Sequence, residues 1–395
     1  MLVAHGRIWS DKPLRIIRFR RQVLACCFYL SVLLVPTSGF AEFAAREAVK
    51  ARDPASYQLA EMTWLGDRLF TVGERGLIAF SDDKGANWQQ ASVPVSATLT
   101  AITFTESGQG WAVGHGGTIL RSKDSGESWE KVFDGRQANE QFLAWAITNK
   151  ERLEAELAEL EAQEEPDEIA IEEAGYALED AVFALDDAEV AVETGPADPL
   201  LDVLFVDDAV GIAVGAYNML YRTEDGGDSW QLSIDNIDNS YRYHLYSVAK
   251  DATGRLHISG EAGLLFYSDD KGKTWTRTED VYDGSLFALV ASPDAVLAIG
   301  LRGNVFRSVD GGQSWSSVVM SGTGSLYNGA VTDRGIYLVG TGGRIALSTD
   351  QGQTFTEFTH PSRAALSAIT TAGQQLLLAG SSGILLENMK EFSRE

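Results

Sequence analysis

A Gly-x-x-Gly motif recurs seven times along this chain of 395 residues, and its spacing constrains the fold more than any other feature. The seven copies begin at Gly73, Gly114, Gly215, Gly260, Gly300, Gly340 and Gly380. Successive copies are 40 to 45 residues apart, except for one step of 101 residues. A period near 40 residues is the length of one four-stranded propeller blade. We therefore predict an all-β fold, a seven-bladed β-propeller, whose long step holds one blade and about 60 inserted residues.

The last position of the motif indicates how its backbone turns. It is glycine in six copies and Asn218 in the third. Asparagine tolerates a positive φ better than other residues that carry a side chain, and glycine adopts it freely. We therefore expect a left-handed conformation at this position, as in a tight hairpin turn.

A second motif, Ser/Thr-x-Asp-x-Gly-x-x-Trp/Phe, follows six of the seven turns and is termed an Asp-box. Its aspartates are Asp83, Asp124, Asp225, Asp270, Asp310 and Asp350. A short carboxylate can accept backbone N–H groups within its own turn, and the aromatic residue can pack over the blade. One copy in each blade would distribute these aspartates around the ring, too far apart to act on one substrate. We interpret them as structural residues.

The paired motifs resemble a known family of repeats. The boxes from Ser81–Trp88 to Ser348–Phe355, each preceded by its turn, look like BNR (Asp-box) repeats. Their arrangement closely resembles the photosystem II stability/assembly factor-like branch of that superfamily, over residues 57–387 apart from the insertion. The resemblance implies a seven-bladed propeller with a basic partner surface, which assists the assembly of a membrane protein complex without catalysis. Because the insertion departs from the family pattern, the client is photosystem II or another complex, such as a transporter.

The amino-terminal segment is typical of a signal peptide. Basic residues, among them Arg18 and Arg21, precede an apolar run at residues 23–35, and Ala41 follows as a plausible cleavage point. The run is shorter than the roughly 20 residues that span a bilayer. We predict a cleaved signal peptide over residues 1–41 and export to the periplasm, with an uncleaved inner-membrane anchor as the alternative. Both cysteines of the chain lie in this segment, so the exported part has no disulfide.

The charge of the chain narrows the class of partner. Without its first 41 residues, the chain carries 26 basic against 55 acidic side chains. Such a surface repels nucleic acid and anionic lipid headgroups, so we expect neither as a direct partner. We expect a monomer that binds a protein, in particular a membrane protein or complex. No phosphate-binding loop or metal-spaced histidine cluster is present, so we predict no cofactor and no metal.

The insertion, residues 137–199, reads as an antiparallel α-helical hairpin of the coiled-coil type. From Glu140 to Glu193 it carries 18 acidic residues against Lys150 and Arg152. Pro166 divides it, and apolar residues in its second half follow heptad steps of three and four. These are Ile171, Ala174, Leu178, Ala181, Leu185, Ala188 and Val192. The hairpin is either a solvated decoration or a docking arm, and the cluster Phe142, Leu143, Trp145 and Ile147 is expected to seat it on the propeller.

The remaining boundaries follow from these elements. Blades 1 and 2 occupy residues 42–136, with a strand near residues 43–50 expected to close the seventh blade. Blades 3 to 7 occupy residues 200–390. Because the insertion follows the outermost strand of blade 2, it leaves from an inter-blade loop, on the same face as the Gly-x-x-Gly turns and opposite the Asp-boxes.

The face with the turns carries our candidate partner-binding residues. Tyrosine and arginine are enriched among residues that dominate binding energy at protein interfaces, and several basic groups gather here on a very acidic protein. The candidates are Arg75, His115, Tyr217, Arg242, Tyr243, His244, Arg302, Tyr327 and Arg363.

The enzymatic alternative is a BNR-repeat glycoside hydrolase or a carbohydrate-binding protein, since sialidases also carry Asp-boxes. The chain lacks the Arg-Ile-Pro tripeptide typical of sialidases. Other glycosidases need two carboxylates about 5–10 Å apart across a cleft. The carboxylates at the turn tips, Glu74 and Glu261, are three blades apart. We therefore predict a protein that is not an enzyme.

Overall fold

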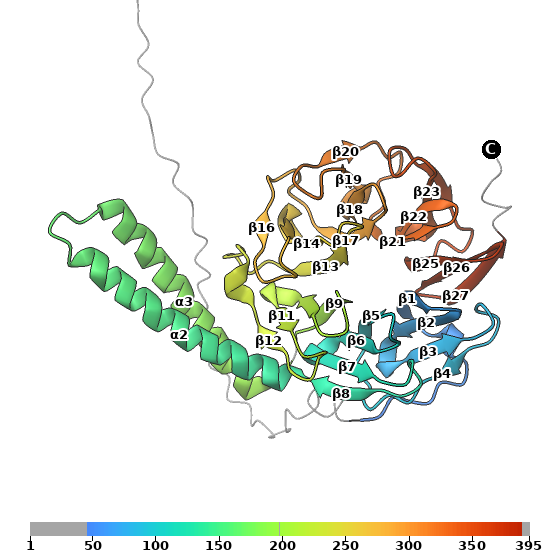
Figure 1. Cartoon of the computed structure of the whole chain (residues 1–395), viewed down its shortest axis with the longest axis horizontal. Helices are drawn as coiled ribbons and strands as arrows, with labels where there is room; N and C mark the ends of the chain where they lie inside the picture. Colours follow the sequence, from blue (N-terminus) through green and yellow to red (C-terminus); the bar gives the residue numbers. More distant parts are fainter. Residues whose placement is uncertain (1–45, 197, 389–395) are drawn as a thin grey trace, which may run out of the picture. The chain divides into compact units, whose positions relative to one another are not determined.

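The computed structural model describes residues 46–196 and 198–388 of the chain; the predicted signal peptide lies outside them. The described residues form seven antiparallel sheets arranged as a ring, which confirms the seven-bladed propeller (Figure 1). In each sheet the strands follow one another from the centre outward in chain order. Among these residues, no helix is long and apolar enough to cross a membrane.

The strands are grouped here by their position in the blade. The inner strands are β1 (Leu59–Leu65), β5 (Leu99–Phe104), β9 (Leu200–Phe205), β13 (Leu245–Lys250), β17 (Leu286–Ala291), β21 (Leu326–Thr332) and β25 (Leu366–Ala372). The second strands are β2 (Arg68–Gly73), β6 (Gly110–Gly114), β10 (Gly211–Gly215), β14 (Leu256–Gly260), β18 (Val296–Gly300), β22 (Gly335–Gly340) and β26 (Gln375–Gly380). The third strands are β3 (Ile78–Ser81), β7 (Thr118–Ser122), β11 (Leu220–Thr223), β15 (Leu265–Ser268), β19 (Val305–Ser308), β23 (Arg344–Ser348) and β27 (Gly383–Asn388). The outer strands are β4 (Gln89–Gln90), β8 (Glu130–Phe133), β12 (Gln231–Leu232), β16 (Thr276–Arg277), β20 (Ser316–Val318) and β24 (Thr356–Thr359).

Each inner strand begins with a leucine that is at most 2% exposed. These leucines lie in apolar clusters that join one blade to the next. The core of the protein is therefore a series of interfaces between neighbouring blades. Its apolar burial ties the blades into one ring.

The first glycine of each turn is required by a close approach of two backbones. A Cβ atom at Gly73 would lie 2.2 Å from the carbonyl oxygen of Gln58, the residue before the inner strand, and the same contact recurs in the other six blades. Beside it, the register of the first two strands shifts by one residue. The last position of the turn has a positive φ, as predicted, including Asn218 at 67°.

The Asp-boxes join the third and fourth strands through one set of hydrogen bonds. In blade 5, Asp310 Oδ1 accepts from the Ser314 N–H at 3.0 Å and from Ser308 Oγ at 2.8 Å. Asp310 Oδ2 accepts from Ser314 Oγ. The Ser308 hydroxyl in turn accepts from the Gly312 N–H at 2.8 Å. The other five boxes repeat this pattern, and in the last the hydrogen bonds lower the pKa of Asp350 to about 2.

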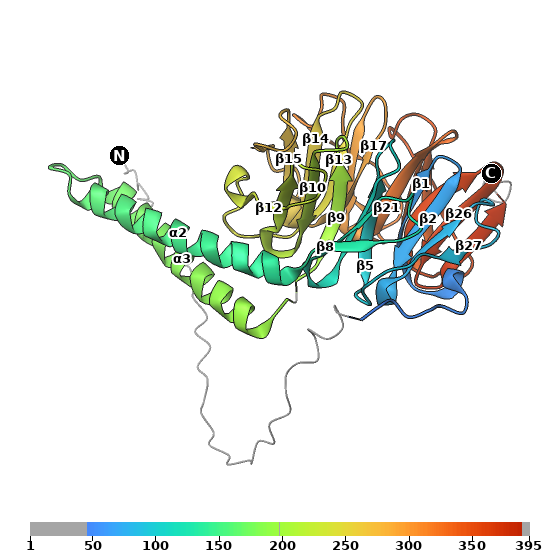
Figure 2. The same ribbon diagram turned by 60° about the horizontal axis from the view of Figure 1, so that its bottom comes forward.

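The insertion forms two antiparallel helices, α2 (Gly135–Glu161) and α3 (Glu168–Thr194), named here the arm. Figure 2 shows them side by side, as the sequence predicts. Each has 27 residues, about 40 Å at the usual rise per residue. The seam between the two helices is lined by small side chains, which let the helices approach closely. On α3 the buried residues are Ala174, Ala181, Ala184 and Ala188. Val192, predicted in the seam, is instead 43% exposed.

The base of the arm is held by side chains near the start of α2. Phe142 and Trp145 pack against the apolar cluster of blades 3 and 4, and Trp145 Nε1 donates to Asp235 at 2.7 Å. The Gly117 N–H, in the turn of blade 2, donates to the Asp198 carbonyl at the other end of the insertion. The arm therefore leaves from the face that carries the Gly-x-x-Gly turns, named here the turn face.

The predicted closing strand does not form over residues 46–50, and residues 43–45 lie outside the described part of the chain. The seventh sheet has three strands in the described part of the chain, and residues 46–50 form no strand there. The backbone of this segment forms hydrogen bonds with blade 1 instead. The Ala48 N–H donates to the Val93 carbonyl, and the Val49 carbonyl accepts from Gln90 Nε2. Blades 7 and 1 are joined instead by side chains. Trp64 Nε1 donates to the Thr370 hydroxyl at 2.8 Å.

Replacing an Asp-box aspartate should destabilise the propeller without altering its outline. Asp310→Ala removes one backbone and two side-chain hydrogen bonds within its turn. We expect the free energy of unfolding to fall by about 1–2 kcal/mol. Urea unfolding measures this change, with Asp333→Ala in an exposed hairpin loop as the control. Equal free energies of unfolding for the two variants would show that the Asp-box hydrogen bonds do not stabilise the turn.

Candidate partner-binding site

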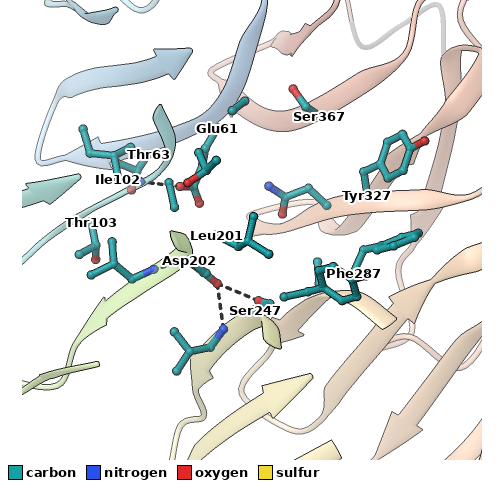
Figure 3. Close-up of a pocket in the computed structure, with 18 of the residues that line it drawn as sticks. Glu61, Thr63, Ile102, Thr103, Leu201, Asp202, Ser247, Phe287, Tyr327 and Ser367 are labelled. Atoms are coloured by element: carbon teal, nitrogen blue, oxygen red, sulfur yellow. Dashed lines mark hydrogen bonds between the residues drawn. The ribbon is translucent and has the colours of Figure 1, made fainter. Parts of the chain in front are cut away.

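A central channel of about 700 Å³ is lined by the inner strands of all seven blades (Figure 3). The inner strands begin at the turn face, since Leu59 at the start of β1 pairs with Gly73 at the end of β2. Side chains near the start of each inner strand therefore lie at the mouth of the channel on the face that bears the arm. We take this mouth as the candidate site.

One side chain per blade is directed to the channel by the register shift. The residue after the leucine has no partner in the ladder of the first two strands, and a bulged residue leaves the regular alternation of the strand. All seven of these residues line the channel. They are Ala60, Thr100, Leu201, Tyr246, Phe287, Tyr327 and Ser367.

The identity of these seven residues makes the channel asymmetric. Blades 4, 5 and 6 carry Tyr246, Phe287 and Tyr327, whereas blades 7, 1 and 2 carry small residues. The ring of Phe287 lies between the two tyrosines, at centroid distances of 5.3 and 5.7 Å. One half of the mouth is therefore a continuous aromatic wall, and the opposite half leaves room for a ligand.

The aromatic wall continues toward blade 3. The ring of His244 is 5.9 Å from that of Tyr246 and 4.7 Å from that of Tyr217. The Tyr217 N–H donates to His244 Nδ1, which fixes the imidazole beside the turn of blade 3. We name these five residues, Tyr217, His244, Tyr246, Phe287 and Tyr327, the aromatic arc. Its members range from half-buried to exposed, so that their faces are accessible to a partner.

Two carboxylates deeper in the wall connect neighbouring blades (Figure 3). Glu61 Oε2 accepts from the Ile102 N–H of blade 2 at 2.7 Å. Asp202 Oδ2 accepts from the Val248 N–H and the Ser247 hydroxyl of blade 4, each at 2.9 Å. Both carboxylates therefore act as links between blades as well as lining the channel.

The position of these carboxylates alters their protonation. Burial and the nearby charge of Asp202 raise the pKa of Glu61 from its usual 4.5 to about 8. Burial also raises the pKa of Asp202, although hydrogen bonds from Val248, Ser247 and Val203 oppose the shift. Around neutral pH, Glu61 is therefore largely a neutral acid in the channel wall.

The structure brings three of the nine candidate residues together. Tyr217, His244 and Tyr327 belong to the aromatic arc. Four others are exposed at separate points of the turn face, each on a different blade or loop: Arg75, His115, Arg302 and Arg363. They lie around the mouth as separate side chains and do not form one basic cluster with the arc.

The other two candidates, Arg242 and Tyr243, pack between the arm and the loop beside it. The Arg242 guanidinium lies 4.5 Å from the ring centroid of Phe142 and 3.6 Å from Asp187, so it bridges α2 and α3. Tyr243 stacks on Tyr241 and packs against the cluster beneath the arm. Neither side chain is a freely presented contact.

The two carboxylates at the turn tips are engaged in local structure. Glu74 Oε1 accepts from the Gln58 N–H, and Glu261 Oε2 accepts from the His244 N–H. They lie on blades 1 and 4, each beside its own inner strand. Each of the two carboxylates therefore stabilises the turn that carries it.

Sequence reasoning missed Tyr246 and Phe287 in the arc, and Glu61 and Asp202 in the wall. The repeat marks these positions in the sequence, because each residue follows the first leucine of its inner strand by one or two positions. Aligning the seven inner strands on that leucine would have revealed the aromatic half of the channel.

The fold and this site together define the class of the protein, a seven-bladed Asp-box propeller with an asymmetric aromatic channel mouth. The model of the family described as photosynthesis system II assembly factor YCF48 matches residues 86–153 and 185–339. The chain belongs to this family.

Individual relatives agree with this assignment. The chain is 31% identical over 272 residues to the photosystem II assembly lipoprotein Ycf48 of Synechococcus sp. (strain CC9902), covering 60% of this chain and 80% of the relative. A solved structure described as YCF48 bound to D1 peptide shares the fold, with a TM-score of 0.57 and 15% identity over 86% of this chain and 98% of that one. YCF48 from Cyanidioschyzon merolae has a TM-score of 0.55 and 17% identity, over 88% of this chain and 99% of that one.

The raised pKa of Glu61 predicts a pH dependence of stability. The folded chain retains this proton up to about pH 8, whereas the unfolded chain loses it near 4.5. Between these values Glu61 binds more protons in the folded state, so its contribution to the free energy of unfolding falls as pH rises. In Glu61→Gln the fall should be shallower by up to about 1.4 kcal/mol per pH unit. Urea unfolding across this window checks the prediction, and parallel profiles for variant and wild type would contradict it.

Proposed function

We propose that this chain is an exported, non-catalytic scaffold that binds a protein segment of a membrane-associated complex and aids its assembly or stability. The observation that carries the proposal is the aromatic arc, in which successive rings lie 4.7 to 5.9 Å apart and of which Tyr246, Phe287 and Tyr327 line the channel. Exposed aromatic side chains in a concave site are typical binding hot spots.

The shape of the mouth favours an extended chain segment as the ligand. The aromatic half offers flat apolar faces, and the opposite half carries Ala60, Thr100 and Ser367 at the equivalent positions, beside Gln58 and Glu74. A peptide that packs its side chains on the arc would run over small residues on the other side. The cations at Arg75, Arg302 and Arg363 surround this path and would attract acidic groups of the partner.

Family membership supports the role in assembly and suggests the client. The YCF48 protein in a solved structure with this fold is bound to a D1 peptide. A related segment of a photosystem II protein is therefore the first candidate ligand for this chain. Because the arm departs from the family pattern, another inner-membrane complex, such as a transporter, is the second candidate.

The sequence supports export and action as a monomer. Residues 1–41 combine a basic start with an apolar run, and an uncleaved anchor is the alternative. The strongly acidic remainder of the chain disfavours self-association through charge repulsion. In either form the propeller would meet its client at the outer surface of the inner membrane.

Binding of a D1 peptide tests the site. Phe287→Ala with Tyr327→Ala removes two neighbouring rings of the arc, and we expect the dissociation constant to rise by about 30-fold, the scale of two hot-spot truncations. Calorimetric titration measures it. Tyr267→Ala, which removes a half-buried tyrosine from the third strand of blade 4, is the matched control. Equal binding by the double variant and the wild type would exclude the arc as the binding surface.

A further inference from the structure

One side of α3 carries apolar residues that α2 leaves largely exposed, and the last of them, Val190, lines the cavity between the arm and the loop of Arg242. On α3, Ile169, Tyr176, Phe183 and Val190 are 70%, 55%, 57% and 57% exposed. They are seven residues apart, so they lie along one side of the helix over about 32 Å. The residues that bury the hairpin seam, such as Ala174 and Ala181, lie on the opposite side of the helix. We name these four residues the heptad stripe.

Carboxylates alternate with the apolar residues of the heptad stripe. The positions three and four residues after each of the first three members are both acidic and exposed. These pairs are Glu172 with Glu173, Glu179 with Asp180, and Asp186 with Asp187. Residues three and four apart share one face of a helix, so each pair lies between two apolar residues. The whole of α3 carries nine carboxylates and no basic side chain.

The heptad stripe is an addition to the family pattern. The family model matches the chain to residue 153 and again from residue 185, so it leaves out residues 154–184. Ile169, Tyr176 and Phe183 lie in that part. The stripe therefore adds a surface to the shared propeller, and it meets the aromatic arc at one end, where Val190 and Tyr217 line the same cavity.

We propose that the heptad stripe docks a basic amphipathic helix of a partner protein, which packs along α3 on the side away from α2. A strict seven-residue repeat selects a helical occupant, because only a helix presents matching side chains at that spacing over 32 Å. The occupant carries an apolar residue at every seventh position and lysine or arginine between them, opposite the carboxylate pairs. A second copy of this chain is disfavoured, since its own carboxylates would meet those of the stripe.

The test uses a synthetic peptide of four heptads with one leucine per heptad and lysine pairs three and four positions later. Binding to the purified protein is measured by fluorescence anisotropy. Tyr176→Gln with Phe183→Gln should weaken binding by about tenfold or more. The matched control is Val182→Gln with Val192→Gln, which changes apolar residues 38% and 43% exposed on another side of α3 and should leave binding within about twofold. Circular dichroism confirms that both variants keep the arm helical.

Four outcomes would overturn the proposal. A scrambled peptide of the same composition that binds equally well would reduce the interaction to charge alone. Equal weakening by the two pairs of substitutions, or no saturable binding by the wild type, would remove the stripe as the docking surface. Self-association of the wild type that is lost in Tyr176→Gln with Phe183→Gln would assign the stripe to a second copy of this chain.

Discussion

The propeller depends on one close approach, between the first glycine of each turn and the carbonyl that precedes the inner strand. In blade 1 any side chain at Gly73 would collide with Gln58, and the other blades repeat this geometry. The contact brings the start of the inner strand against the end of the second strand and accompanies the register shift beside it. Each blade therefore closes in the same way and directs one residue into the channel. That residue differs from blade to blade, because it has no partner in the ladder of the first two strands, although Thr100 and Ser367 at this position donate hydrogen bonds to the next blade.

The proposed function depends on which residue each blade carries at this position. Three consecutive blades place aromatic rings at the varying position, and the three blades on the other side place small residues there. The next layer of the wall is used differently, since Glu61 and Asp202 link adjacent blades through backbone N–H groups. In the proposed function, the aromatic residues of this ring supply recognition, whereas the layer beneath it links blades through two carboxyl groups with raised pKa values.

Much of the fold follows from local sequence, whereas the site does not. The turn conformation, the Asp-box and the two helices are decided by residues close in the chain, as Asn218, Asp310 and Pro166 illustrate. The closing strand failed because its backbone partners, among them Val93, are set by tertiary packing. Arg242 was expected at a partner surface, but its contacts with Phe142 and Asp187 depend on where the arm lies. Tyr246 and Phe287 required an alignment of the blades on their leucines.

Site-specific photocrosslinking tests the central claim most directly, that a partner is bound at the mouth of the channel on the turn face. A photoreactive phenylalanine is placed at Phe287 in the arc or at Lys271 in an Asp-box on the opposite face. With the client complex or its peptide present, the account predicts crosslinks from position 287 and none from position 271. Crosslinks from position 271 with none from position 287 would contradict it.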